Sequence, residues 1–128
     1  MSILKKIEKL QEIKGYLGAA VFNPEGKMLG GVTDVAGINF EIAGSLFHDL
    51  FLITRNQTRE AGFGETDIIM LYTKNGIIMG QSFDEEDVHF HTILALRNDA
   101  NIAMAKLLLS KTQIALRKVI EALEEKKR

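Results

Sequence analysis

The sequence predicts an α+β fold in which a five-stranded antiparallel sheet is covered on both faces by three helices. Residues 66–96 predict three of the strands, the first two joined at Asn75-Gly76, a pair typical of tight hairpin turns because both residues tolerate positive φ. Residues 16–33 predict a second hairpin, and three stretches with helical apolar spacing complete the order helix, two strands, helix, three strands, helix. The strands are long apolar runs, so helices must cover both faces of the sheet.

The first helix is expected near the amino terminus, where four apolar residues recur at helical spacing: Ile3, Ile7, Leu10 and Ile13. Ser2 can cap its start, and Gly15 can end it. Strands at residues 16–22 and 27–33 follow, joined by Asn23-Pro-Glu-Gly26, in which proline fixes φ and glycine ends the turn. The leading strand is apolar without alternation, which predicts cover on both of its faces.

The central predicted helix runs over residues 39–62, with Asn39 as its cap and Gly62 as its stop. At ~1.5 Å per residue it would be roughly 33 Å long, which exceeds the length of a typical strand, so it must cross the whole sheet. Its apolar side chains fill an arc of about 180°, whereas one packed face requires only ~100°. They are Phe40, Ile42, Ala43, Leu46, Phe47, Leu50, Phe51 and Ile53. One sheet does not account for that arc.

The rest of this helix carries a mostly polar strip, which is formed by Glu41, Ser45, His48, Leu52, Arg55 and Arg59. Leu52 is the apolar member of this polar strip. Two interpretations stay open: a solvated face with one stray leucine, or a surface for a partner. Single exposed leucines are common on folded proteins, so composition does not decide between them.

The last helix is expected to start at a cap provided by Asn98 or Asp99 and to reach a charged end at residues 124–128. No repeat, low-complexity tract or linker divides the chain. With 128 residues, 46% of them hydrophobic and 26% charged, the chain has the size and composition of one compact domain. We therefore expect residues 1–128 to form a single domain.

Charge and cysteine content argue against several classes of partner. Sixteen basic and 17 acidic residues give a formal net charge of -1, without the basic footprint of a nucleic-acid or anionic-membrane binder. The chain has no cysteine, and therefore no disulfide framework and no thiolate site. Charges interrupt the apolar residues of the amino terminus, unlike a signal peptide or a membrane span. We expect a soluble, cytoplasmic protein that neither binds nucleic acid nor inserts into a membrane.

No catalytic or cofactor-binding motif is present, and the strongest candidate for a metal site is Asp87-Val-His89-Phe-His91. Strand alternation would put Asp87, His89 and His91 on one side, as metal binding requires. The remaining histidine, His48, lies on a different element, so partly exposed histidines, or histidines hydrogen-bonded beneath a helix, are the preferred interpretation. The run from Asp84 to Asp87 lacks the spacing of a calcium loop and is expected to be a solvated turn.

Several stretches together resemble the Roadblock family: residues 15–26, the long helix, the meander with Lys74-Asn-Gly76, and residues 99–105 at the start of the last helix. That family includes dynein light chains, bacterial and archaeal GTPase regulators, and scaffold subunits of endosomal signalling complexes. The resemblance covers nearly the whole chain. It departs from the family pattern at Asn23, where many members have aspartate, and at Ala103, where glycine is frequent. Neither departure concerns chemistry.

The resemblance implies that the central helix covers one face of the sheet and the terminal helices the other. It also implies a dimer of the chain with itself or with a paralogue, in which the third strand pairs edge to edge and the central helices lie side by side. The interface on that strand would be Ile68, Ile69, Met70, Leu71 and Tyr72. The residues themselves agree, because a flat apolar edge strand without proline or charge aggregates unless something covers it.

The resemblance further implies that the paired central helices bind a small Ras-like GTPase through the polar strip, either to activate it or as a scaffold. The chain would then be a non-enzymatic regulator without a cofactor. Arg55 and Arg59 raise the idea of an arginine finger, but exposed helix arginines are usually solvated, and we do not assign one. Two alternatives stay open: a small-ligand sensor, which needs a pocket, and a metal-dependent enzyme that uses Asp87, His89 and His91.

Overall fold

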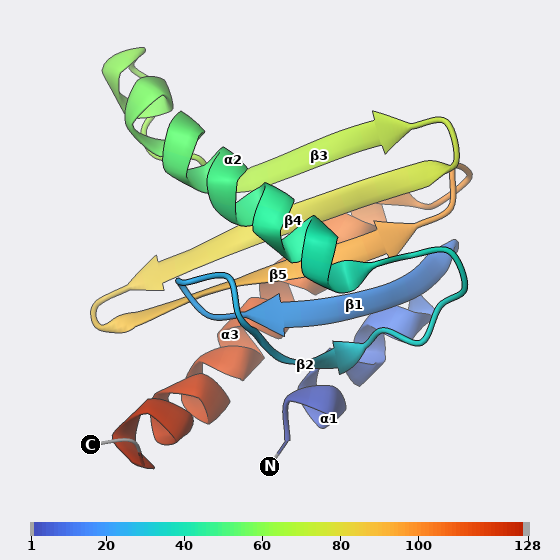
Figure 1. Ribbon diagram of the computed structural model, residues 1–128, viewed down its shortest axis with the longest axis horizontal. Coiled ribbons are helices and arrows are strands. Elements are labelled where there is room, and N and C mark those ends of the chain that lie inside the picture. The colour runs from blue at the N-terminus through green and yellow to red at the C-terminus, as the bar shows by residue number, and fades with distance from the viewer. Residues whose placement is uncertain (1, 127–128) are drawn as a thin grey trace.

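The computed structural model describes residues 2–126 and shows a five-stranded antiparallel sheet between two layers of helices (Figure 1). The helical elements are α1 (Ile3–Ile7), the 3₁₀ helix η1 (Glu8–Glu12), α2 (Phe40–Glu60) and α3 (Ile102–Lys126). The strands are β1 (Tyr16–Phe22), β2 (Met28–Val32), β3 (Ile68–Thr73), β4 (Gly76–Glu85) and β5 (Val88–Leu96). Their order is β2-β1-β5-β4-β3, which confirms the predicted α+β class. None of the described helices is long and apolar enough to cross a membrane.

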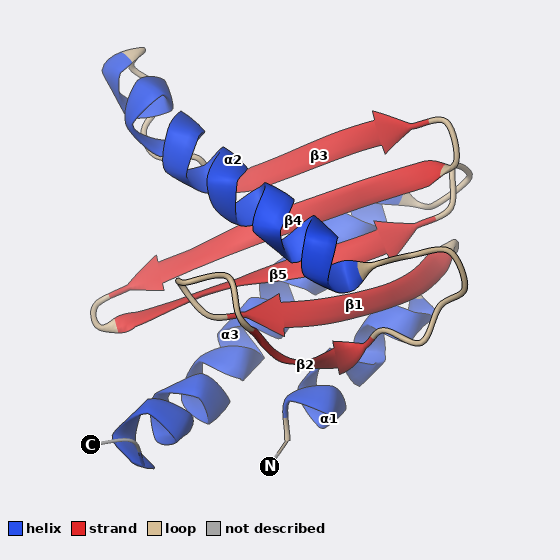
Figure 2. Cartoon of the chain, viewed as in Figure 1, coloured by secondary structure: helices blue, strands red, loops and turns tan. Residues whose placement is uncertain are grey.

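The sheet separates two apolar cores. α2 crosses one face of the sheet, whereas α1, η1 and α3 lie on the other (Figure 2). The core beneath α2 consists of aromatic rings and small or β-branched residues: Ala20, Phe22, Phe40, Ala43, Phe47, Phe51, Ile93 and Ala95. The other core is larger and joins buried residues of α1, η1 and α3 to the sheet. Helices thus cover both faces, as the apolar strands predict.

Glycine allows α2 to lie close to the sheet. A Cβ built on Gly44 of α2 would overlap the Phe22 ring, and a Cβ built on Gly80 of β4 would overlap the Phe47 ring. Both rings are fully buried, so neither can move aside. The path of α2 over the sheet therefore depends on these two positions having no side chain.

Local capping sets both ends of α2. Asn39 Oδ1 accepts a hydrogen bond from the Ile42 N–H at 3.0 Å, which confirms the predicted cap. At the other end, Gly62 has a φ of +93° and its N–H donates to Arg59 O at 3.0 Å. The helix stops there because the left-handed conformation of Gly62 turns the chain away and satisfies a terminal carbonyl.

The amino-terminal helix is not the single α-helix that the sequence predicts. It changes to 3₁₀ geometry after Ile7, and the Ile13 N–H donates to Leu10 O at 3.1 Å. Ile7, Leu10 and Ile13 are all buried. Side chains three residues apart eclipse one another on a 3₁₀ helix, whereas on an α-helix they are offset by about 60°. Burial of these three side chains against the sheet explains the tighter geometry.

The turn between β3 and β4 differs from the predicted one. Its two residues are Lys74 and Asn75, and neither has positive φ, so the prediction of a primed turn at Asn75-Gly76 is wrong. Gly76 instead opens β4 opposite Thr73. A Cβ at Gly76 would lie 2.8 Å from Leu96 O on the neighbouring strand, so glycine is needed there for a close backbone approach.

α3 starts later than the sequence predicts. Asn101 Oδ1 accepts the Met104 N–H at 3.1 Å and caps the helix, whereas Asn98 and Asp99 lie in the preceding turn. The N–H of Asn101 also donates to Lys14 O at 3.1 Å. Asn98, Asp99 and Asn101 are all suitable cap residues by type, and the contact with Lys14 favours Asn101.

Candidate functional site

The middle of the polar strip on α2 lies next to the β4–β5 hairpin, at one end of the sheet. There the helix, the two strands and the turn after β1 enclose a cleft of about 300 Å³. Its lining is Pro24, His48, Phe51, Leu52, Arg55, Ser82, Asp84, His89, Phe90 and His91. Charged and polar groups thus come together from elements far apart in the chain.

Asp84 is the centre of a polar cluster in this cleft. Its Oδ2 accepts hydrogen bonds from Arg55 Nη2 at 3.2 Å and Ser82 Oγ at 2.7 Å, and its Oδ1 lies 2.9 Å from His89 Nδ1. Partial burial by itself would raise the pKa of Asp84. The hydrogen bonds with Ser82 and His89 and the charge of Arg55 together lower that pKa below its ordinary value. Asp84 therefore stays ionised and ties α2 to the hairpin.

His91 forms the inner wall of the cleft. Its ring stacks on Phe22 with 5.5 Å between centroids, and the centroids of His48 and Phe51 lie 6.3 Å and 5.9 Å away. The residue is only 5% exposed, and its Nε2 has no hydrogen-bond partner within the described part of the chain. Burial, followed by the charge of nearby His48, lowers the pKa of His91 to about 4. Near neutral pH the ring is therefore uncharged.

The register of the β4–β5 hairpin creates this arrangement. Ser82 pairs with His91, and Asp84 pairs with His89, so each polar residue faces another across the ladder. Ser82 and Asp84 alternate with an apolar residue on β4, as the two histidines do on β5. That matching alternation is the sequence signal that could have located the cluster.

The prediction that residues 84–87 form a solvated turn is wrong for Asp84. β4 continues through Glu85, and the turn consists of Glu86 and Asp87 alone. Glu86 has a φ of +53°, the left-handed conformation that such a short connection requires. Asp84 is thus a strand residue, and pairing with β5 draws its side chain into the cleft.

The structure does not assemble the predicted metal candidate. His89 and His91 lie in the cleft, but Asp87 belongs to the turn and does not line it. The carboxylate that meets His89 is Asp84. Within residues 2–126, no group of three histidine, aspartate or glutamate side chains is placed to hold a metal ion.

Comparison with known proteins identifies the architecture. No family model and no curated protein matches this sequence. Solved structures do match: the gliding protein MglB from Thermus thermophilus is 14% identical, with 92% of this chain and 87% of that chain covered and a TM-score of 0.76. A Roadblock/LC7 domain from Streptomyces avermitilis is 10% identical over 94% of this chain and 99% of that chain, with a TM-score of 0.78. An MglB with a tetrameric arrangement is 14% identical over 92% and 87%, with a TM-score of 0.78.

The chain has the Roadblock fold. The placement of α2 on one face and of α1 and α3 on the other confirms what the resemblance implies, and so does the position of β3 at an edge. Sequence identities this low establish the fold alone.

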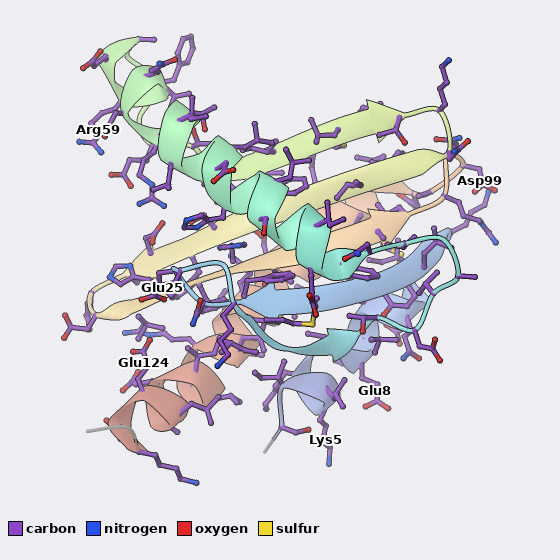
Figure 3. The ribbon with its side chains drawn as sticks, viewed as in Figure 1. Lys5, Glu8, Glu25, Arg59, Asp99 and Glu124 are labelled. Carbon is purple, nitrogen blue, oxygen red and sulfur yellow. The ribbon has the colours of Figure 1, made fainter. Side chains whose placement is uncertain are left out.

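Within this Roadblock fold, the polar strip divides into a part that frames the cleft and a part that does not. The strip residues in the cleft are His48, Leu52 and Arg55. Arg59 lies near the carboxyl end of α2 (Figure 3) and pairs through Nη2 with Glu65 Oε1 at 2.8 Å. Glu41 and Ser45 are exposed outside the cleft. A cavity thus interrupts a surface that the sequence presents as one continuous strip.

The outer edge of β3 is free in the single chain of this Roadblock fold. Ile69 and Leu71 pack toward the core beneath α2, whereas Ile68 and Met70 pack toward the core beneath α3. Tyr72 is exposed. The flank of α2 opposite the polar strip carries three exposed apolar side chains: Ile42, Leu46 and Ile53. The sheet therefore leaves part of the wide apolar arc uncovered, as predicted.

Proposed function

We propose that this chain is a non-enzymatic regulator or scaffold that dimerises through β3 and binds a small Ras-like GTPase across its paired α2 helices. The observation that carries the proposal is that α2 has two exposed flanks with different chemistry. One flank is apolar and exposed, and the other is the polar strip that frames the cleft. The Roadblock fold and the resemblance of the sequence to that family support the class of partner.

The backbone of β3 supports pairing with a second chain. The Ser82 N–H donates to Asp67 O at 3.0 Å, and hydrogen-bonded pairs alternate along an antiparallel ladder. In the observed register, Ile68, Met70 and Tyr72 therefore direct their N–H and C=O groups away from β4. A two-fold axis at this edge would satisfy those groups and would bring the exposed apolar flanks of two α2 helices together.

The polar strip supports a separate surface for the GTPase. Leu52 is 58% exposed, although the polar side chains near it line the cleft together with residues of other elements. Arg55 forms an ion pair with Asp84, and Arg59 forms one with Glu65, so both guanidinium groups already have partners within the chain. This favours a partner that acts by contact and positioning, with Leu52 as an apolar anchor at the rim of the cleft.

The test combines assembly and binding. Light scattering over a dilution series to low micromolar concentration should give the mass of a dimer. Ras-like GTPases loaded with GDP or with a non-hydrolysable GTP analogue should then be captured according to their nucleotide. Leu52→Glu should abolish capture and leave the dimer intact.

Leu107→Glu is the matched control, because Leu107 is 55% exposed on α3, on the opposite face of the sheet. It should change neither the mass nor the capture. A monomeric mass together with capture that does not depend on the bound nucleotide would contradict the proposal. Equal loss of capture in Leu52→Glu and Leu107→Glu would also contradict it.

A second candidate function, a small-ligand sensor, is favoured by the cleft itself. A volume of about 300 Å³ is at the lower end of ligand sites, and His91, whose buried Nε2 has no partner among the described residues, is one of the lining residues. Saturable thermal stabilisation by a fraction of small metabolites, lost in His91→Phe, would support this alternative. No stabilisation by any fraction would remove it.

A further inference from the structure

Basic residues are concentrated in part of the helical layer formed by α1, η1 and α3. Residues 2–14 and 102–118, which are the α1–η1 segment and the first 17 residues of α3, contain eight basic and two acidic residues, whereas the last part of α3, residues 119–126, adds one basic and three acidic residues. Outside residues 2–14 and 102–118, the chain contains eight basic and 15 acidic residues. The formal net charge of -1 therefore conceals a basic part of this layer and an acidic remainder of the chain.

The lysines of this layer are uncommitted. Every ion pair among the described residues uses arginine or histidine as its basic partner, and none uses lysine. Four lysines border the groove between α1 and α3, together with Glu8 and Glu12: Lys5, Lys6, Lys9 and Lys111. Figure 3 shows Lys5 projecting from α1 away from the sheet. Their charge is available to an external partner.

Exposed aliphatic side chains accompany these lysines. Leu107 and Ile114 are seven residues apart on α3, so they share one face, and they are 55% and 70% exposed. Lys111 lies between them along that face, and Leu4 is exposed beside Lys5 on α1. The layer thus combines unpaired positive charge with protruding apolar groups.

We propose that the α1–η1–α3 layer docks on the surface of an anionic phospholipid membrane. The lysines would neutralise lipid headgroups, and Leu4, Leu107 and Ile114 would enter the headgroup boundary. This binding is peripheral and involves no membrane-spanning segment. Aliphatic side chains distinguish the surface from a nucleic-acid site, where aromatic or arginine side chains normally contact the bases. The arginine of the layer, Arg117, is instead engaged by Glu85 and Glu86.

Docking on this side would leave α2 and its cleft facing away from the lipid, because the sheet separates the two layers (Figure 1). A single chain can dock in this way whether or not it has the function proposed above. If β3 does pair two chains as proposed, both basic layers would lie on the same side of the extended sheet. Their binding to one membrane would then be reinforced by avidity.

The experiment is vesicle flotation of the full chain. The probes are vesicles of phosphatidylcholine alone and vesicles in which phosphatidylserine replaces part of the phosphatidylcholine. The chain should float only with the anionic vesicles, and rising salt should release it. In Lys5→Glu/Lys111→Glu, affinity should fall roughly thirtyfold or more, because each lysine near an anionic surface contributes about fivefold.

Lys27→Glu/Lys74→Glu is the matched control. It makes the same change in net charge at two exposed lysines outside the basic layer and should bind nearly as well as the wild type. Circular dichroism should show that both double variants remain folded. Failure to bind anionic vesicles at low salt, equal binding to neutral vesicles, or equal loss in the control would overturn the proposal. Tighter binding to duplex DNA or polyglutamate than to the anionic vesicles would also overturn it, in favour of a different partner.

Discussion

Arg55 on α2 and Asp84 on β4 meet with 3.2 Å between Nη2 and Oδ2, although 29 residues separate them in the chain. Their side chains are 32% and 26% exposed, so water screens the pair only in part. The contact connects the helix to the far end of the β4–β5 hairpin and forms one wall of the cleft. It therefore links the stability of this end of the fold to the geometry of the candidate site.

A double-mutant cycle of Arg55→Ala and Asp84→Ala should give a coupling free energy of about 0.5–1 kcal/mol. Asp84→Ala alone should cost more than Arg55→Ala alone, because it also removes the partner of Ser82 and His89. Urea unfolding at neutral pH measures all four free energies. Additive single effects would show that the two side chains do not interact in solution.

The buried His91 should make the protein sensitive to mild acid. Its pKa falls from 6.5 to about 4 on folding, so below pH 6.5 the unfolded chain gains a proton that the folded chain does not. The stability present at neutral pH is therefore lost progressively between pH 6.5 and pH 4. The loss from this one group is about 3 kcal/mol, since each pKa unit corresponds to ~1.4 kcal/mol.

His91→Phe should flatten this part of the pH profile. Phenylalanine can stack on Phe22 in the same place, and it removes a ring nitrogen that has no partner. At pH 7 the variant should lie within about 1 kcal/mol of the wild type, and denaturant unfolding at several pH values should separate the two profiles. Parallel profiles from pH 7 to pH 4 would show that His91 protonates equally in both states.

Gly44→Ala should destabilise the protein by about 1–3 kcal/mol through overpacking, although glycine-to-alanine changes inside helices normally stabilise by ~1 kcal/mol. The new methyl group would overlap the buried ring of Phe22, which also stacks on His91. Ser45→Ala is the control, because Ser45 is the exposed neighbour on the same helix and should change stability by less than about 0.5 kcal/mol. Thermal unfolding of both variants tests the comparison. A stabilised Gly44→Ala variant would mean that α2 does not approach the sheet this closely.

Met70→Pro should separate dimerisation from folding. The Met70 N–H points away from β4, and proline is tolerated at such positions of an edge strand, so the chain should fold but remain monomeric. Leu71→Pro should instead destabilise the chain itself, because the Leu71 N–H points toward Ile78 on β4. Circular dichroism and light scattering distinguish these results. A dimeric Met70→Pro variant would exclude edge pairing through β3.

Local pattern predicted the features that arise from nearby residues. Asn39 caps α2 because an Asx side chain reaches an N–H three residues on, and that geometry is encoded within one helical turn. The excess of apolar residues on α2 was also visible in the sequence. Ile42, Leu46 and Ile53 exceed what one packed face can bury, and all three are exposed.

The errors concern positions at which distant segments decide the structure. The β3–β4 turn depends on the approach of Gly76 to Leu96, and the α3 cap depends on the contact of Asn101 with Lys14. Asp84 lies in the cleft because it is a strand residue that pairs with His89 on β5. A pattern of spacing along one chain contains no direct measure of such contacts.

The sequence by itself determined the number and kind of elements, the caps of α2 and the presence of more apolar surface than one sheet can cover. These follow from the periods of helix and strand and from hydrogen bonds within one turn. Only the tertiary structure decided that Arg55, Asp84, His89 and His91 share a cleft, and that unpaired lysines gather on one layer. These lysines lie in two stretches, residues 2–14 and 102–118, that are far apart in the chain, and the packing of α1 and α3 on the same face of the sheet brings them together, because such contacts join residues that are distant in sequence.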